Sequence, residues 1–243
     1  MLTKASIFSQ LRDHKQAIKY FNEALRLVEG EEDRDEIYLD LAMEYQALRD
    51  FNGALKVLKE AIRINPSNEG AIYEIAYCYD PLGNFKKAIK CYSDFIDENP
   101  YSFTAWYNLG NAYSKLEDYE QAIDAYGYCI VINEDFGPVY FNLGNAYMGQ
   151  DDFQQAIDAF QKCMDLDGED PMAFCYMGEC FEQLGDLNSA EFYYRRSLDL
   201  APLLPDAWLG LGIVEDLKGN TQEGITLILK ASELDPITAL QTD

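Results

Sequence analysis

The cysteines and the single histidine are the residues of this sequence best suited to metal binding or nucleophilic catalysis. No two cysteines are spaced as C-x-x-C, so a zinc site would have to be assembled from thiolates scattered along the chain. A nucleophile paired with a histidine would have to use His14, which follows Asp13 in a predicted surface turn. We therefore predict no metal site and no catalytic residue, and we interpret the cysteines as core residues of a reducing compartment. The six cysteines are Cys78, Cys91, Cys129, Cys163, Cys175 and Cys180.

Two further patterns could support catalysis, and neither is specific. The stretch GLGIVED, residues 210–216, loosely resembles a nucleotide-binding loop, but it lacks the third glycine and follows no predicted strand. The 43 acidic residues could include a general acid–base pair, yet carboxylates on helices far more often lie in solvent. The sequence therefore predicts a protein that is not an enzyme and has no cofactor.

The charge of the chain restricts its partners. Lysine and arginine number 19 against 43 acids, a formal net charge of −24. Such a charge repels phosphate backbones and anionic lipids, so we predict no nucleic-acid and no membrane partner, and a partner that is basic or neutral. No apolar run approaches the ~18–20 residues of a membrane span, and the first residues lack the apolar stretch of a secretory signal. Together with the cysteine content, this indicates a cytoplasmic protein.

The acidic residues are unevenly distributed along the chain. Residues 1–34 contain 6 basic and 6 acidic residues, whereas residues 103–243 contain 6 basic and 25 acidic ones. This asymmetry indicates either a docking surface for a basic segment or a solvated outer face, and we favour the second interpretation.

A 34-residue repeat runs through the sequence. Units beginning at residues 35, 69, 103, 137, 171 and 205 align, and a partial unit precedes them with about three extra residues within Val28–Glu36. Apolar residues recur at helical spacing in each half of a unit, so we predict two amphipathic helices per unit. The eighth and twentieth places are always small, which lets the two helices approach closely. These places hold Ala5, Ala42, Ala76, Gly110, Gly144, Gly178 and Gly212, then Ala17, Ala54, Ala88, Ala122, Ala156, Ala190 and Gly224.

The ends of the second helix are also marked in each unit. The sixteenth place is always Asp or Asn, which are preferred N-cap residues. Pro66, Pro100, Pro202 and Pro236 are predicted to follow the point where the second helix ends. The predicted caps are Asp13, Asp50, Asn84, Asp118, Asp152, Asp186 and Asn220.

Two patterns at this period resemble the tetratricopeptide repeat (TPR) family: W-x-x-L-G-x-x-Y, and A-x-x-x-aromatic. In one unit they are formed by Trp106, Leu109, Gly110, Tyr113, Ala122 and Tyr126. The resemblance covers essentially the whole chain and implies an all-α fold, an α-solenoid wound as a right-handed superhelix whose concave face is lined by the first helices. We predict one solenoid over 1–243 with seven helix pairs, the first incomplete. Its units are 1–34, 35–68, 69–102, 103–136, 137–170, 171–204 and 205–243.

In TPR proteins the concave groove usually binds a partner, so the resemblance implies a non-enzymatic scaffold for protein–protein interaction. Aromatic rings provide contact area at low entropic cost, and asparagine can both donate to and accept from a peptide backbone. A peptide or a partner-protein segment, extended or helical, would suit such a groove. The same residues are also common at these places in the family whether or not they bind. The predicted groove residues are Tyr73, Tyr77, Tyr107, Asn108, Asn111, Phe141, Asn142, Asn145, Tyr176 and Glu179.

Two subclasses of the family bear on the partner. TPR domains that bind the C-terminal carboxylate of chaperones share a clamp of basic residues and two asparagines. Asn111 and Asn142 match those asparagines, but the basic places hold Tyr107, Met172 and Tyr176, so we do not expect this partner. The alternative to a free scaffold is a regulatory or substrate-docking region of a larger enzyme, such as a glycosyltransferase. It rests on Asn108 and Asn142, which lie one unit apart like the start of an asparagine ladder.

The last unit has an unusual composition. Its second helix contains Ile225, Leu227, Ile228, Leu229 and Leu234, apolar on more than one predicted face, and only a short segment follows Pro236. Its first helix has Glu215 where the other units place an aromatic ring. Because a terminal repeat needs a polar cap, we expect either that further sequence covers this end or that it packs on a partner or on a second copy of itself, and we favour self-association.

Overall fold

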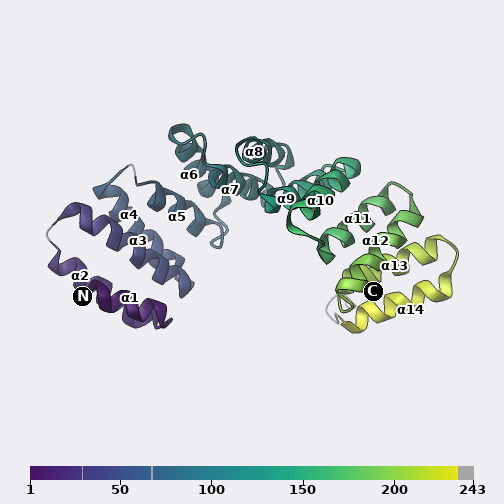
Figure 1. Ribbon diagram of the computed structural model, residues 1–243, viewed down its shortest axis with the longest axis horizontal. Helices are drawn as coiled ribbons and strands as arrows, with labels where there is room; N and C mark the ends of the chain where they lie inside the picture. The colour runs from purple at the N-terminus through teal and green to yellow at the C-terminus, as the bar shows by residue number, and fades with distance from the viewer. Residues whose placement is uncertain (29, 67, 235–243) are drawn as a thin grey trace. The chain divides into compact units, whose positions relative to one another are not determined.

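The computed structural model describes residues 1–28, 30–66 and 68–234 (Figure 1). Within these residues every regular element is an α-helix, which confirms the predicted all-α fold. None of these helices is both long enough and apolar enough to cross a bilayer.

The helices group into two compact units, residues 1–118 and 119–243. In each unit every helix packs against the next one along the chain (Figure 1). In addition, α3 contacts α5 in the first unit and α11 contacts α13 in the second. The first unit contains α1 (Leu2–Gln10), α2 (His14–Leu27), α3 (Glu31–Ala47), α4 (Phe51–Ile64), α5 (Glu69–Tyr79), α6 (Phe85–Glu98) and α7 (Phe103–Ser114). The second contains α8 (Tyr119–Ile132), α9 (Gly137–Gly149), α10 (Phe153–Asp167), α11 (Pro171–Gln183), α12 (Leu187–Leu200), α13 (Pro205–Leu217) and α14 (Thr221–Leu234).

The small residues of the repeat lie where the helices of a pair approach closely. All fourteen are buried, as predicted. A Cβ atom added to Gly144 would lie 2.6 Å from the ring of Phe160, and one added to Gly178 would lie 2.8 Å from the ring of Tyr194. Since these rings are themselves buried, the glycines of the first helix provide the space that an aromatic residue of the second helix occupies.

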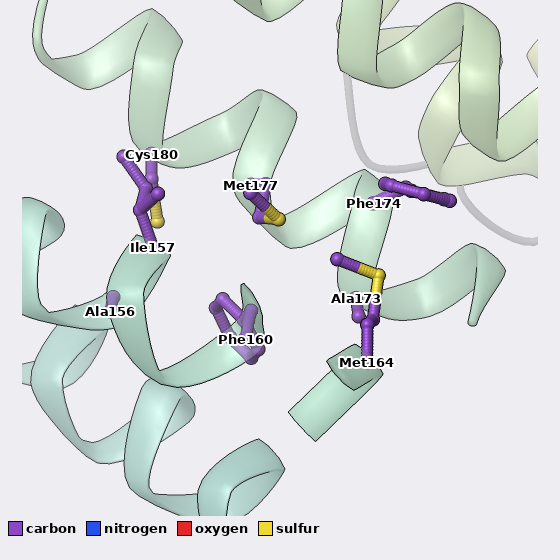
Figure 2. Packing of buried hydrophobic residues seen from close by; sticks show 8 residues of the cluster. All are labelled: Ala156, Ile157, Phe160, Met164, Ala173, Phe174, Met177 and Cys180. Carbon is purple, nitrogen blue, oxygen red and sulfur yellow. The ribbon is translucent and has the colours of Figure 1, made fainter. Parts of the chain in front are cut away.

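A cluster of buried residues joins α10 and α11 in the core of the second unit (Figure 2). Phe160 is fully buried near the middle of the cluster. Ile157 and Cys180 lie at one end, and Met164 and Phe174 lie at the other, as expected for two antiparallel helices (Figure 2).

The turn between paired helices repeats with a constant geometry. The residue before the cap adopts a left-handed conformation, and the amide of the cap residue bonds back to the carbonyl five residues earlier, as from Asp152 to Tyr147 at 2.9 Å. This arrangement satisfies carbonyl groups at the end of the first helix. Glycine is suited to the left-handed position, but four turns instead use a residue with a side chain. The left-handed residues are Arg12, Arg49, Gly83, Glu117, Asp151, Gly185 and Gly219.

The predicted N-caps are confirmed at four of the turns. Asp13, Asp50, Asp152 and Asp186 each accept a hydrogen bond from the amide three residues later. Asn84 is also the N-cap residue of α6, but its side chain makes no cap hydrogen bond, and its amide instead donates to the carbonyl of Leu82.

The side-chain amide of Asn220 donates to Glu215 at 2.7 Å. An asparagine carries two donors that a carboxylate lacks, so a neighbouring acceptor can turn it away from the helix.

Proline and the acidic insertion define where some helices begin and end. Helices α4, α6 and α12 end at Ile64, Glu98 and Leu200, each two residues before a proline, as predicted. Pro236 lies outside the described residues. Helix α3 begins at Glu31, within the insertion, and is 17 residues long.

His14 does not lie in a surface turn, as the sequence suggested, but begins α2. Its Nδ1 atom lies 2.8 Å from a carboxylate oxygen of Glu44 in α3. The Glu44 side chain is only 6% exposed, and that of His14 is 24% exposed. A buried carboxylate needs a polar partner, so this histidine links α2 to α3 and has a structural role.

Glu215 replaces the aromatic ring of the other units with a network of ionic contacts. It is 3% exposed and accepts hydrogen bonds from Arg195 at 3.4 Å and from Asn220. Arg195 also pairs with Glu191, which in turn pairs with Lys218. The carboxylate therefore joins α12, α13 and the turn before α14, which compensates for the missing ring.

Helix α14 is less exposed than its composition suggested. Leu227 packs against the core of the unit, and a Cβ atom added to Gly212 would lie 2.7 Å from the side chain of Ile228. Ile225 and Leu229 are exposed, at 47% and 59%. Self-association through this end stays a prediction.

A methyl group at Gly144 is expected to destabilise the fold, because the buried Phe160 ring has no room to move. We expect Gly144→Ala to lower the free energy of unfolding by about 1–3 kcal/mol. Gly127 in α8 is the matched control, since an added Cβ there meets nothing within 4 Å. Gly127→Ala should stabilise the protein by about 0.5–1 kcal/mol. Urea denaturation of both variants tests this, and equal effects of the same sign would contradict the packing argument.

The contact between His14 and Glu44 is expected to contribute to stability. A double-mutant cycle of His14→Ala, Glu44→Ala and the double variant should give a coupling free energy of about 1 kcal/mol. Each single change removes a partner of the other residue, so the double change should cost less than the sum. Thermal denaturation monitored by circular dichroism measures this, and strictly additive effects would show that the contact contributes nothing.

Candidate functional site

The ten predicted groove residues all lie on the first helices of the repeats. Five belong to the first unit, on α5 and α7, and five to the second, on α9 and α11. The two sets are therefore treated as two separate surfaces.

In the first unit, one tyrosine and one asparagine of the set are joined directly. The side-chain amide of Asn108 donates to the hydroxyl oxygen of Tyr73 at 2.6 Å. The Tyr73 ring packs edge-on against Tyr92 at 6.0 Å, and burial raises the pKa of its hydroxyl. Tyr77, one turn further along α5, is 46% exposed. This surface therefore has a fixed Tyr73–Asn108 pair beside an exposed ring.

In the second unit, two residues of the set form an aromatic cluster over the core. Phe141 of α9 and Tyr176 of α11 lie 5.8 Å apart, and both contact the buried Phe160 ring, at 5.6 and 5.7 Å. Such ring pairs stabilise the fold by more than the burial of their apolar area alone. The cluster holds Tyr176 in place, so its position does not depend on a ligand.

A hollow of about 410 Å³ lies beside Tyr176 and brings three of the predicted residues together. We call it the groove hollow. Asn145, Tyr176 and Glu179 line it, together with residues from the starts of α8 and α10 and the ends of α9 and α11. Its other lining residues are Tyr119, Met148, Gly149, Asp151, Phe153 and Gln183.

The charged side chains that line the groove hollow are all acidic. They are Asp151 and Glu179, and no lysine or arginine is among the lining residues. Partial loss of hydration, followed by repulsion from Glu182 and Asp206, raises the pKa of Glu179. A cation in this hollow would relieve that repulsion.

Sequence reasoning missed the residues contributed by the turns. Tyr119 and Phe153 occupy the same place in consecutive units, directly after the cap, and so carried a periodic signal. A Cβ atom on Gly149 would lie 2.5 Å from the Tyr119 ring, so this glycine allows the ring to lie against the end of α9. That contact depends on the packing of α8 against α9, which the repeat pattern alone did not specify.

The cysteines lie in the core rather than in a reactive site. Five are buried, and Cys91 is half-buried. Burial raises the pKa of Cys129 to about 11 and those of Cys175 and Cys180 to about 12, which keeps these thiols protonated at neutral pH. Among the described residues, no group of three or more histidine, cysteine or acidic side chains is placed to hold a metal ion.

Comparison with solved structures identifies similar folds. The C-terminal part of a TPR repeat-containing protein from Cytophaga hutchinsonii shares 17% identity with a TM-score of 0.77, covering 97% of this chain and 96% of that one. MamA shares 25% identity with a TM-score of 0.64, covering 69% and 91%. YrrB, described as a TPR protein with an unusual peptide-binding site, shares 21% identity with a TM-score of 0.62, covering 74% and 92%. A comparison with curated protein sequences found no match.

Family models agree with these structural similarities. Models described as tetratricopeptide repeat match residues 1–67, 45–95, 103–136, 138–170 and 173–202. Together with the helix pairs and the buried small residues, these matches establish that the chain belongs to the tetratricopeptide repeat family.

Proposed function

We propose that this protein is an interaction scaffold that binds a basic segment of a partner protein along α9 and α11. The groove hollow carries the proposal, because it combines aromatic walls with charged groups of one sign. A lysine or arginine side chain entering it would gain ring contacts and two carboxylates.

The size and the rigidity of the groove hollow support this function. A volume of about 410 Å³ is within the range of sites that bury a ligand, and it is large enough for one long side chain and its neighbours. Tyr176 is held by Phe141 and Phe160, so little side-chain entropy is lost when a partner contacts it. Asn145 and Gln183 add donors and acceptors for a peptide backbone.

The family and its structural neighbours support a scaffold without naming a partner. TPR proteins bind protein partners, and the description of YrrB names a peptide-binding site. The net charge of −24 favours basic partners over acidic ones and accelerates their association. The exposed Tyr77 beside the Tyr73–Asn108 pair provides a second contact surface of similar type in the first unit.

The proposal predicts which peptides the protein selects and which residues they need. Selection from a random 12-residue peptide library should enrich lysine and arginine. Binding of the enriched peptides, measured by fluorescence anisotropy, should weaken about fivefold or more in Tyr176→Ala and in Glu179→Gln, since each removes a contact of about 1 kcal/mol.

Two matched controls test the location of binding. Tyr101→Ala removes a ring that is 84% exposed in the other unit, and Asp158→Asn removes an exposed carboxylate of α10 outside the groove hollow. Neither should change the affinity. Enriched peptides without basic residues, or with equal affinity for all four variants, would refute the proposal.

The raised pKa of Glu179 predicts a pH dependence of binding. As the pH falls through this pKa, which lies above the ordinary value of 4.5, Glu179 loses its charge and the affinity for a basic peptide should decrease. Glu179→Gln should show lower affinity at neutral pH and a flatter pH profile.

The same variant also has an expected effect on stability. A carboxyl whose pKa is raised on folding disfavours the folded state above that pKa, so Glu179→Gln should not lose stability at pH 7. Parallel titration calorimetry and thermal melts separate the two effects. An unchanged pH profile in this variant would show that another group governs the dependence.

A further inference from the structure

A second hollow in the same unit lies on a different side of α11. Its volume is about 650 Å³, and we call it the α10–α12 hollow. It is lined by the C-terminal half of α10, by α12 and by Phe174 of α11. Phe174 and Tyr176 are two residues apart on one helix, about 200° around its axis, so the two hollows use opposite sides of α11.

Aromatic rings and one methionine form the apolar part of the α10–α12 hollow. Met164 and Phe174 are the end of the core cluster shown in Figure 2, and both are 7% exposed. The Tyr193 ring lies 6.0 Å from Phe174 and 5.1 Å from Phe192, which it meets edge-on. Phe192 is 57% exposed, so its ring is accessible to a partner.

One arginine of the chain already binds to an aromatic ring and a carboxylate of this hollow. The guanidinium of Arg196 lies 5.6 Å from the centre of the Phe174 ring and donates to Glu169 at 2.7 Å. Arg196 also lies 3.9 Å from Asp199. A guanidinium held between a ring face and a carboxylate is a favourable arrangement, because both partners attract its charge and its flat shape allows stacking.

A second aromatic ring and a second carboxylate lie at the rim of the hollow, where a partner could contact them. Phe192 is the exposed ring, and Asp165 is the carboxylate. Among the described residues, Asp165 accepts a hydrogen bond from the neutral amide of Gln161 at 2.9 Å and pairs with no lysine or arginine. Glu169 and Asp199 together exceed the charge of Arg196 by one negative charge, and Asp165 adds another, so the charged groups around this hollow have a net negative charge.

We propose that the α10–α12 hollow receives an arginine side chain of a partner protein, stacked on Phe192 and paired with Asp165. Arginine fits better than lysine because its planar guanidinium covers a ring and donates two parallel hydrogen bonds to a carboxylate. The large negative net charge favours approach of such a segment. The scaffold then has binding sites on two sides of α11 and can hold two segments at once.

The proposal is tested with N-acetyl-arginine amide as the probe and ¹⁵N-labelled protein observed by NMR. The expected result is a saturable set of amide shifts around residues 161–169 and 189–196. The neutral isostere N-acetyl-citrulline amide should produce much smaller shifts there. Shifts spread evenly over the acidic surface, or equal shifts with the citrulline probe, would overturn the proposal.

Substitutions on α10 provide a matched pair. Asp165 and Asp158 each accept a hydrogen bond from a glutamine four residues earlier, but only Asp165 lines the hollow. Asp165→Asn and Phe192→Ala should each weaken probe binding at the α10–α12 hollow by about two- to fivefold, whereas Asp158→Asn should not. Equal effects of the two aspartate changes would show that the probe is held only by general electrostatic attraction, and this would overturn the proposed site.

Two further measurements separate this site from its alternatives. Tyr176→Ala, which alters the groove hollow, should leave the shifts around Phe192 unchanged, so this inference and the proposed function can fail independently. Free arginine carries an α-ammonium and an α-carboxylate that an arginine residue within a protein lacks, and a site built for the side chain alone should bind it no more tightly than the blocked probe. Tighter binding of free arginine would identify a small-molecule site and overturn docking of a protein partner.

Discussion

The close approach of neighbouring helices at small residues is the constraint on which the rest of the structure depends. In the last pair, a Cβ atom on Gly212 would lie 2.9 Å from the carbonyl oxygen of Gly224, and one on Gly224 would lie 2.7 Å from that of Gly212. In other pairs the space beside the glycine is filled by a ring, as Gly144 is by Phe160. Since interiors are close-packed, these contacts set how far apart the helix axes lie.

That spacing decides which side chains are left to bind a partner. The α11 helix buries Met177 and Cys180 against α10, while Tyr176 and Glu179 face the groove hollow and Phe174 reaches the α10–α12 hollow. A helix in the middle of a stack contacts neighbours along part of its surface, so more than one strip remains for recognition. At Tyr176, the rings of Phe141 and Phe160 fix the position of a side chain that belongs to a proposed site.

Charge acts on the two proposed sites and on the fold in different ways. Within the fold, buried carboxylates are paired: Glu44 contacts His14, and Glu215 contacts Arg195 and Asn220. At the groove hollow, burial and then repulsion from Glu182 and Asp206, which lie near Glu179 but do not line the hollow, raise the pKa of Glu179. A site that is unfavourable for its own charges becomes favourable when a cation binds, which is the physical basis of the basic partner we propose.

The sequence by itself determined the fold. The 34-residue period, the small residues and the prolines after α4, α6 and α12 predicted the helices because each signal is local and repeats in every unit. It also placed Tyr176, Glu179 and Asn145 on the correct helices. Only the tertiary structure decided what these residues meet. Three contacts each join residues of different helices: Asn108 with Tyr73, His14 with Glu44, and Tyr119 with Gly149. Such contacts depend on the spacing and the rotation of the helices, and a repeat pattern in the sequence specifies neither. The two hollows therefore could be located only from the packed helices.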